Sequence, residues 1–397
     1  MRFFVFPLAV ILACAAFVGL SNRNAVDKAE ASVDSSDIGL EDLGEMLFFD
    51  VNLSANRTQS CSSCHDPAFG FADPRGMASP GDDGVSLGDR NAPTAAYAAL
   101  TPPFHRNQDG EWMGGQFLDG RASTLEDQAG GPPLNPVEMG MPDEAAVMAR
   151  LLENEVYQEA FPALFGEQIF DNANAAYEAM TQAIAAFERT DFFSPFDSKY
   201  DRFLRGEAEL TNQEELGRLL FFSQQFTNCN QCHQVALSAL DQRETFSDYL
   251  YHNIGTPQNT ALRELNGVPQ GTIDAGLANN PTVDGAPEAM GRFRTPTLRN
   301  VAVTGPYMHN GVFADLRTVV LFYNTYNTQS DERLINPETG EAFDPPPIPD
   351  TLSLEELEHG PALDDRRVDA LVAFMKTLTD ARYEHLLEED ETSGLSQ

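Results

Sequence analysis

Two short segments of the sequence combine a pair of thiols with an imidazole: Cys61-Ser62-Ser63-Cys64-His65 and Cys229-Asn230-Gln231-Cys232-His233. In such a Cys-x-x-Cys-His segment, the thiols can add across the two vinyl groups of a porphyrin, and the adjacent histidine can then bind its iron. We therefore expect two covalently bound haems of the c type. The thioether anchors would be Cys61, Cys64, Cys229 and Cys232, and the iron ligands would be His65 and His233.

Other chemistries of paired cysteines fit the sequence less well. A zinc site needs two Cys-x-x-Cys pairs close enough to wrap one ion, and these two pairs are separated by most of a domain. A thioredoxin-like redox pair belongs to an alternating α/β pattern, which the sequence does not show. Disulfide formation in an oxidising compartment would not explain why a histidine follows each pair.

The segments that must position the haems repeat along the chain. Leu43-Gly44-Glu45-Met46-Leu47-Phe48-Phe49 precedes the first motif, and Leu216-Gly217-Arg218-Leu219-Leu220-Phe221-Phe222 precedes the second. Each segment predicts a short amphipathic helix whose apolar face covers a haem. Each half also closes with an apolar pattern of helical spacing. These patterns comprise Tyr177, Met180, Ile184 and Phe187 in the first half and Val368, Leu371, Phe374, Met375 and Leu378 in the second.

The chain is long enough for two domains. Its 397 residues, of which 42% are hydrophobic, can form two ordinary cores. We place an N-terminal cytochrome c-like domain at 38–200, a C-terminal one at 201–385 and an acidic tail at 386–397. Thr211 and Glu214 predict a capping box at the start of the next helix. With Gly- and Pro-rich stretches between the helices, the predicted fold is mainly α: two cytochrome c-like haem domains joined by a short linker, with long ordered loops.

The net charge and the N-terminal segment indicate which partners the protein binds and in which compartment it works. The 61 acidic and 25 basic residues give a formal net charge of -36, which argues against nucleic-acid binding and fits either a basic protein partner or a saline habitat. Met1-Arg2 and the apolar run from Phe3 to Leu20 predict a signal peptide, or an N-terminal anchor, over 1–24. We therefore expect a periplasmic protein.

The sequence resembles the family of bacterial di-haem cytochrome c peroxidases and MauG proteins, from about residue 38 to about residue 380. Besides both haem motifs, the resemblance rests on Arg90-Asn91-Ala92-Pro93-Thr94, Asp119-Gly120-Arg121-Ala122, Asn135-Pro136-Val137-Glu138-Met139, Pro296-Thr297-Leu298-Arg299-Asn300-Val301 and Gly305-Pro306-Tyr307-Met308-His309-Asn310-Gly311. It implies that hydrogen peroxide reacts at the first haem, where Gln128 and Glu138 match the distal-pocket residues. A carboxylate there can take a proton from peroxide and return it to the departing oxygen. Without the resemblance, Glu138 reads as a loop cap and Gln128 as a polar helix residue.

The resemblance also implies what occupies the remaining coordination position of each haem iron. Many family peroxidases carry a distal histidine before the Asn-Ala-Pro-Thr segment, but 66–103 contains none. The first haem is therefore expected to keep an open position, as in MauG, and Asp89 nearby is a poor haem ligand. For the second haem, the matching ligand position is Tyr323, with Met308 as the alternative. Tyr323 could instead be an ordinary core aromatic residue.

Three further positions carry family expectations. Calcium would be bound by the side chain of Asn91 and the backbone carbonyls of Thr304 and Pro306, because oxygen ligands suit this ion. Leu118 stands where the family usually has a tryptophan between the haems, which puts the coupling between them in doubt. Trp112, the only tryptophan in the chain, either substitutes for it or has an ordinary packing role.

The remaining histidines carry little expectation. His309 falls in a family segment, where we expect a structural hydrogen bond near a haem edge. A lone histidine is usually a polar surface residue or a satisfied core residue, so no role is assigned to the others. These are His105, His252, His359 and His385.

The leading hypothesis is a periplasmic di-haem peroxidase that reduces hydrogen peroxide with electrons from a small redox protein such as cytochrome c. One alternative is MauG-like, peroxide-dependent oxidation of a residue in a protein substrate. Another is an electron carrier without enzymatic activity, in which both irons are six-coordinate. The resemblance also implies that the protein could form a homodimer.

Overall fold

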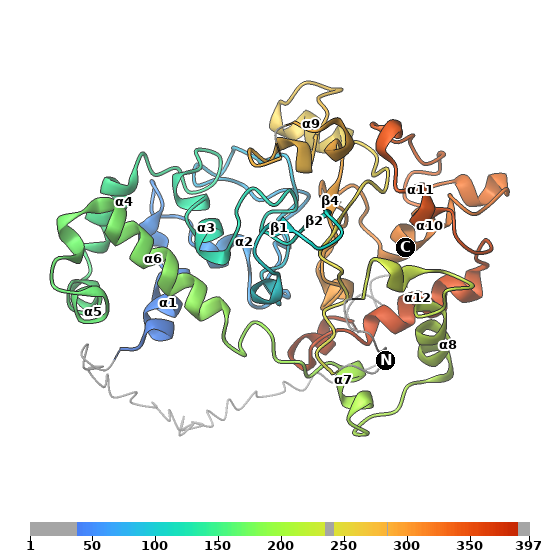
Figure 1. Cartoon of the computed structure of the whole chain (residues 1–397), viewed down its shortest axis with the longest axis horizontal. Coiled ribbons are helices and arrows are strands. Elements are labelled where there is room, and N and C mark those ends of the chain that lie inside the picture. Colours follow the sequence, from blue (N-terminus) through green and yellow to red (C-terminus); the bar gives the residue numbers. More distant parts are fainter. Residues whose placement is uncertain (1–37, 235–241, 284, 388–397) are drawn as a thin grey trace, which may run out of the picture. The chain divides into compact units, whose positions relative to one another are not determined.

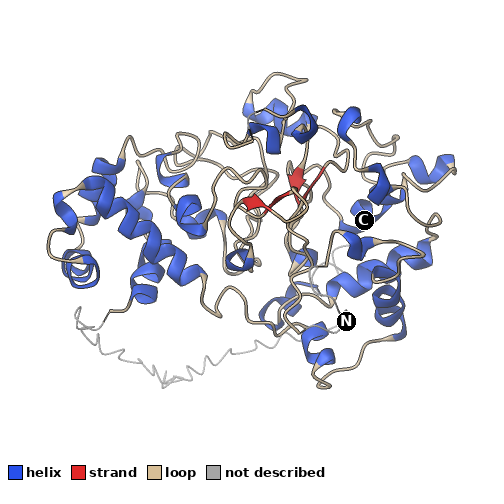
Figure 2. Ribbon diagram, in the orientation of Figure 1, coloured by secondary structure: helices blue, strands red, loops and turns tan. Residues whose placement is uncertain are grey.

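The computed structural model describes residues 38–234, 242–283 and 285–387, which belong to one compact unit. The predicted signal peptide or anchor at 1–24 and residues 388–397 of the predicted acidic tail lie outside the described residues. Within them, the chain is mainly helical, with long irregular segments and strands of only two residues (Figure 1, Figure 2). The expectation of a mainly α fold with little sheet is confirmed.

A pair of packed helices dominates the first part of the chain. Helix α1 (Leu40–Phe48) packs against α6 (Ala173–Glu188), the longest helix described (Figure 1). Between them in sequence, α2 (Cys61–Cys64) carries the first Cys-x-x-Cys-His motif. Three other helices also contact α6: α3 (Leu125–Ala129), α4 (Glu144–Leu151) and α5 (Glu155–Phe165).

A second pair of packed helices follows. Helix α8 (Asn212–Phe221) packs against α12 (Asp365–Lys376), and α12 also contacts α10 (Leu316–Asn324). The capping box predicted at the start of α8 is confirmed: the Glu214 amide donates to Thr211 Oγ1 at 3.2 Å, and the Thr211 amide donates to Glu214 Oε2 at 2.6 Å. The other helices of this part are α7 (Lys199–Leu204), α9 (Thr260–Asn266) and α11 (Leu354–Leu357).

The two helix pairs repeat one packing arrangement. A Cβ atom on Gly44 of α1 would overlap the carbonyl oxygen of Ala183, and a Cβ atom on Gly217 of α8 would overlap the carbonyl oxygen of Ala370. The third close neighbour is Phe187 Cβ in the first pair and Phe374 Cβ in the second, at 2.8 Å in both. Only glycine therefore lets each short helix approach its partner this closely. The weak repeat in the sequence corresponds to a repeated structural unit.

Each helix pair has its own hydrophobic core. One core is built from buried residues between Ile38 and Phe193, and another from buried residues between Tyr200 and Leu378. The residues of both predicted helical patterns, in α6 and around α12, are all buried, as expected. These cores lie on either side of residue 200, where the domain boundary remains a prediction.

Two small antiparallel pairs of strands lie between the helices. Strand β1 (His105–Arg106) pairs with β2 (Trp112–Met113), with His105 opposite Met113. Strand β3 (Tyr251–His252) pairs with β4 (Phe293–Arg294), with Tyr251 opposite Arg294. An isolated bridge between Met113 and Leu250 links the two pairs. Segments more than 130 residues apart in sequence are therefore joined by backbone hydrogen bonds, including that from the Gly114 amide to the Tyr249 carbonyl at 2.9 Å.

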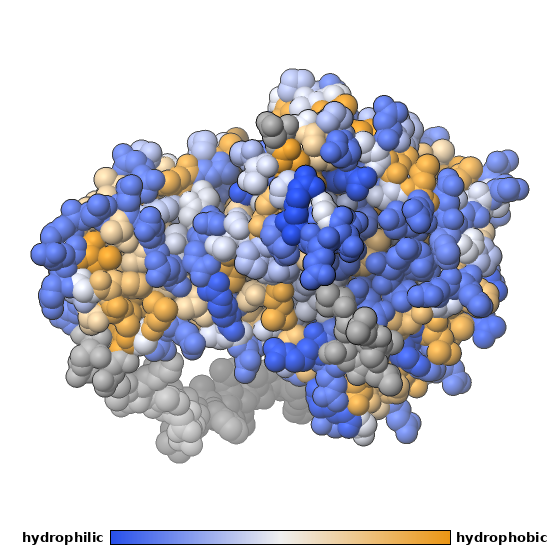
Figure 3. Space-filling view, viewed as in Figure 1, coloured by the Kyte–Doolittle hydropathy of each residue, from blue (hydrophilic) through white to orange (hydrophobic). Residues whose placement is uncertain are grey.

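The surface agrees with the acidic composition. Figure 3 shows a mostly hydrophilic face with scattered apolar side chains. Among the described residues, none of the helices has both the length and the apolar character needed to cross a membrane.

Candidate active site

Each Cys-x-x-Cys-His motif forms one tight helical turn. In the first, the His65 amide donates to the Cys61 carbonyl at 2.9 Å, and the Ser60 amide is capped by Ser63 Oγ at 3.0 Å. In the second, a 3-10 helix spans Cys229–Gln231, and the His233 amide donates to the Cys229 carbonyl at 3.0 Å. All four cysteines are free thiols. Both motifs thus keep the groups that a c-type haem would use.

Both motif histidines are oriented by a backbone carbonyl. Nδ1 of His65 lies 3.3 Å from the carbonyl oxygen of Phe71, and Nδ1 of His233 lies 3.0 Å from that of Phe246. Phe71 and Phe246 are both buried, with left-handed φ values of 58° and 57°. Burial lowers the pKa of both imidazoles, so they are neutral at pH 7. When Nδ1–H donates to a carbonyl, Nε2 keeps its lone pair for a metal.

One cavity of about 960 Å³ brings the two motifs together. Its lining includes the cysteines and histidine of both motifs, with apolar side chains from the helix pairs such as Ile184, Phe221 and Leu371. A largely apolar wall with a few polar groups is typical of cofactor sites. The thiols, the neutral imidazoles and this wall fit haem.

Glu138 and Gln128, the predicted distal residues, both line this cavity. Oε1 of Glu138 accepts a hydrogen bond from Asn135 Nδ2 at 2.9 Å. Burial raises the pKa of Glu138, and the nearby Arg121 guanidinium opposes this only in part. The carboxylate also acts electrostatically on Cys64, which places it near the first motif. Glu138 is thus a carboxyl group that holds a proton more readily than an exposed glutamate does, as a residue that transfers protons requires.

Tyr323 and Met308, the alternative ligands of the second haem, also line the cavity. Tyr323, on α10, is partly buried, and burial raises the pKa of its hydroxyl; the thiols of Cys232 and Cys229 raise it further. The phenol is therefore near the second motif and would need a cation such as iron to ionise at neutral pH. Met308 has a left-handed backbone, with a φ of 69°.

Asn91, Thr304 and Pro306, the predicted calcium ligands, line the cavity as well. Nδ2 of Asn91 donates to the Met77 carbonyl at 3.3 Å, so its Oδ1 faces away from this partner. The Asn91 amide donates to the His309 carbonyl at 2.8 Å. This backbone bond joins two of the segments that carry the family resemblance.

Leu118 lines the cavity, and its carbonyl accepts from the Arg294 amide at 2.8 Å. Trp112 is not among the described residues that line it. Its ring stacks on Phe104, with centroids 4.7 Å apart, and Arg106 lies 4.1 Å from the ring centroid. Trp112 therefore has a packing role within β2.

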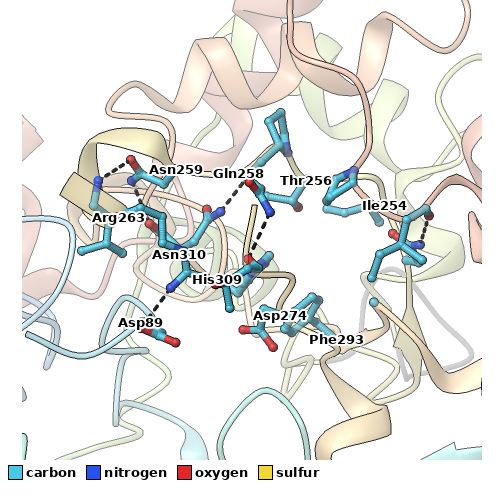
Figure 4. Close-up of a pocket in the computed structure, with 17 residues that line it drawn as sticks. Asp89, Ile254, Thr256, Gln258, Asn259, Arg263, Asp274, Phe293, His309 and Asn310 are labelled. Atoms are coloured by element: carbon cyan, nitrogen blue, oxygen red, sulfur yellow. Dashed lines mark hydrogen bonds and ion pairs between the residues drawn. The ribbon is translucent and has the colours of Figure 1, made fainter. Parts of the chain in front are cut away.

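His309 lines both the large cavity and a smaller pocket of about 30 Å³, which is roomy enough for about one water molecule. Figure 4 shows His309 among the residues of the smaller pocket. Its ring stacks on Phe293 at 3.7 Å, and burial lowers its pKa to about 4, although Asp274 opposes the shift. The backbone carbonyl of His309 accepts from the Asn91 amide, and the expected hydrogen bond near a haem edge stays a prediction.

Sequence reasoning missed several charged residues at the cavity. Arg90 bonds Asp274 at 2.6 Å and Asp119 at 2.7 Å, so it joins the two segments of the family resemblance that contain Arg90 and Asp119. His252 was assigned no role, yet its Nε2 lies 3.0 Å from Asp248 Oδ2 on the cavity wall. Burial opposes a charge on His252, but bonds to Asp248 and Cys232 raise its pKa to about 10. The i,i+4 spacing of Asp248 and His252 was the only signal for this pair.

Comparison with known proteins agrees with the family resemblance found in the sequence. Residues 40–209 match the di-haem cytochrome c peroxidase family. Over 359 residues the chain is 54% identical to the methylamine utilization protein MauG of Paracoccus denitrificans, covering 89% of this chain and 92% of that protein. The chain belongs to the di-haem cytochrome c peroxidase and MauG family.

Two further family relatives agree. The cytochrome c551 peroxidase of Nitrosomonas europaea is 30% identical over 316 residues, 77% of this chain and 78% of that protein. The crystal structure of the di-haem peroxidase BthA from Burkholderia thailandensis matches with a TM-score of 0.73 at 33% identity, covering 87% of this chain and 86% of that one. Family membership implies two haem cofactors and oxidoreductase chemistry with peroxide.

Proposed function

We propose that the protein is a periplasmic di-haem peroxidase that reduces hydrogen peroxide with electrons from a small redox protein. The observation that carries this proposal is the partly buried Glu138, with its raised pKa, on the cavity wall near the first motif. Export would be directed by the segment at 1–24. The net charge of -36 favours a basic partner such as a cytochrome c.

Two c-type haems would be held through thioether bonds to Cys61 and Cys64 and to Cys229 and Cys232, and would supply redox-active iron for peroxide reduction. His65 and His233 present neutral imidazoles, oriented by the carbonyls of Phe71 and Phe246. Tyr323 is the proposed second ligand at the C-terminal site, with Met308 as the alternative. Calcium is proposed at Asn91, Thr304 and Pro306.

Glu138 acts as the general base and then the general acid of the reaction. Asn135 holds its Oε1 at 2.9 Å, so Oε2 is the atom that can take a proton from peroxide and return it to the departing oxygen. Its raised pKa suits both steps, because the group must accept and then donate within one turnover. Gln128 is proposed to orient peroxide through its side-chain amide. The largely apolar wall limits competing water.

The proposal is tested with Glu138→Gln in the haem-loaded protein, with reduced cytochrome c as electron donor. We expect kcat/KM for peroxide to fall by about 10² to 10⁴-fold, with haem content unchanged. Glu45→Gln, at an exposed position on α1, is the matched control and should behave as the unchanged protein. Equal activity in Glu138→Gln and Glu45→Gln would remove Glu138 from the mechanism.

A second candidate function is peroxide-dependent oxidation of a residue in a protein substrate. The 54% identity to a protein named MauG and the tyrosine at position 323 favour it. A phenolate ligand would stabilise higher oxidation states of iron, which suits oxidation of a substrate more than electron entry. Oxidation of a tryptophan or tyrosine in an added protein, with peroxide and no reduced cytochrome, would support this function over the first.

A further inference from the structure

A carboxyl group that the proposed reaction does not use is buried in the cavity wall. Glu188, the last residue of α6, is 5% exposed and lines the cavity that holds both motifs. Its Oε2 is fully buried and has no hydrogen-bond partner among the described residues. Burying a carboxyl without a partner is costly, so most proteins avoid it. Glu188 therefore calls for a functional explanation.

The internal repeat shows that packing does not require a carboxyl at this position. Because Ala183 and Phe187 contact Gly44 as Ala370 and Phe374 contact Gly217, the two helices align residue by residue. The alignment places Ile184 opposite Leu371 and Glu188 opposite Met375, and all four of these residues line the cavity. At the same place on the wall, the second half has an apolar thioether and the first half has an acid.

Burial and two neighbouring charges set the pKa of Glu188. Burial raises its pKa to about 8; the Arg189 guanidinium opposes this and Glu126 adds to it. Arg189 is itself bonded to Glu126 at 2.8 Å, so these two charges largely offset each other. The Glu188 carboxylate also acts on Cys61, the first thioether anchor. The carboxyl is thus close enough to the first haem site to respond to charge there.

The other elements packed against α6 bring no stronger charge to Glu188. The buried residues of α1 and α4 are apolar, and the 3-10 helix Ala98–Leu100 has no titratable side chain. From α5 comes Tyr157, whose hydroxyl donates to Asp50 Oδ2 at 3.1 Å. In the 3-10 helix Ile169–Asp171, Asp171 is exposed. The charge on the iron of the first haem, which changes with its oxidation state, is therefore the main variable charge that can shift the pKa of Glu188.

We propose that Glu188 is a proton-binding site whose occupancy follows the oxidation state of the first haem. The inference rests on the proposed haem attachment at Cys61 and Cys64. When the redox partner donates one electron to the ferric iron, the Glu188 carboxylate takes one proton from solvent and becomes the neutral acid. When the iron is oxidised again, the electron leaves and the proton returns to solvent. The ferric state favours the ionised carboxylate, and the ferrous state favours the acid.

The test is a spectroscopic redox titration of the haem-loaded protein over a pH range centred on the pKa of Glu188. We expect the midpoint potential of the first haem to fall with rising pH, with a slope that approaches one proton per electron. In Glu188→Gln the slope should be lost. Glu188→Met, which introduces the residue found at the aligned position Met375, should lose the pH dependence of the potential too. This second variant shows whether a packing defect, and not the loss of the carboxyl, causes the result in Glu188→Gln.

Two control variants separate Glu188 from its neighbours. Glu138→Gln should keep the slope, although it removes the other carboxyl that lines the cavity near the first motif. Glu126→Gln should keep it as well, with the transition displaced to lower pH, because Glu126 raises the pKa of Glu188. The reduced-minus-oxidised infrared difference spectrum should show the carbonyl band of a protonated carboxylic acid, absent from Glu188→Gln.

Two results would overturn the inference. One is a potential of the first haem that does not change with pH in the unsubstituted protein, and the other is an unchanged slope in Glu188→Gln and Glu188→Met. If both variants fail to bind haem, proton uptake on reduction of the unsubstituted protein decides, and its absence overturns the inference. Peroxide turnover with two attached haems but no proton coupling would leave the proposed peroxidase intact.

Discussion

Replacing Asp201 should destabilise the protein and disturb the second haem site, because Asp201 is half of a fully buried ion pair. Oδ2 of Asp201 accepts from Arg299 Nη1 at 2.6 Å, and both side chains are 0% exposed. Arg299 also donates from Nε and Nη2 to the carbonyl of Glu244, at 2.9 and 2.6 Å. That carbonyl lies two residues before Phe246, whose own carbonyl orients His233. The pair thus supports the loop that positions His233, the proposed iron ligand.

The size of the effect follows from the burial. Removing one partner of a buried pair leaves an uncompensated charge and typically costs about 3 to 5 kcal/mol. We therefore expect Asp201→Asn to lower the free energy of unfolding in urea by about 3 kcal/mol or more. The low-spin spectrum of the second haem should change as well, because the Glu244 to Phe246 loop is held less tightly.

Two further variants serve as controls for this prediction. Asp365→Asn removes a carboxylate of the exposed pairs with Arg317 and Arg333, and should leave stability almost unchanged. The double variant Asp201→Asn with Arg299→Met should recover part of the loss, since no unpaired charge remains. A loss below about 1 kcal/mol in Asp201→Asn would refute the assigned importance of the pair.

Three other predictions address the repeat, the second haem and pH. Gly44→Ala should lower the unfolding free energy by about 1 to 3 kcal/mol, because the new methyl group overlaps the Ala183 carbonyl; an unchanged melting temperature would contradict this packing. Tyr323→Phe should alter the low-spin electron paramagnetic resonance signal while Met308→Leu leaves it unchanged, and the reverse pattern would make Met308 the ligand. For Glu188, whose pKa rises from 4.5 to about 8 on folding, the folded state binds the extra proton, so the contribution of this one group to stability is fully present below pH 4.5 and is lost as pH rises to about 8. Urea unfolding across this range should show a decline of up to about 1.4 kcal/mol per pH unit relative to Glu188→Gln, and parallel curves for the two proteins would contradict the shift.

Much of the fold could be predicted because its signals are local in sequence. The segments around Gly44 and Gly217 showed the helical spacing and the repeat, and the capping box at Thr211 marked the start of α8. Each depends on neighbours within a few residues, which a single sequence displays. The reason for the repeated glycines, close approach to the carbonyls of Ala183 and Ala370, became clear only from the packed helices.

The site could be predicted only in part. The motifs gave the thiols and histidines, but the carbonyls of Phe71 and Phe246 that orient the histidines carry no side-chain signal. The pairing of Asp201 with Arg299 joins residues 98 positions apart, which spacing cannot show. Glu188 lies at the end of an apolar pattern and reads as an ordinary surface acid, so its burial emerged only from the structure.

The central claim is that the first haem has an open position beside Glu138, where peroxide reacts. The most direct test is a pair of optical and electron paramagnetic resonance spectra of the ferric protein, before and after one equivalent of hydrogen peroxide. We predict one high-spin and one low-spin haem, with rapid spectral conversion on addition of peroxide. Two low-spin haems that peroxide does not change would contradict the open site and favour a reductively activated peroxidase or an electron carrier.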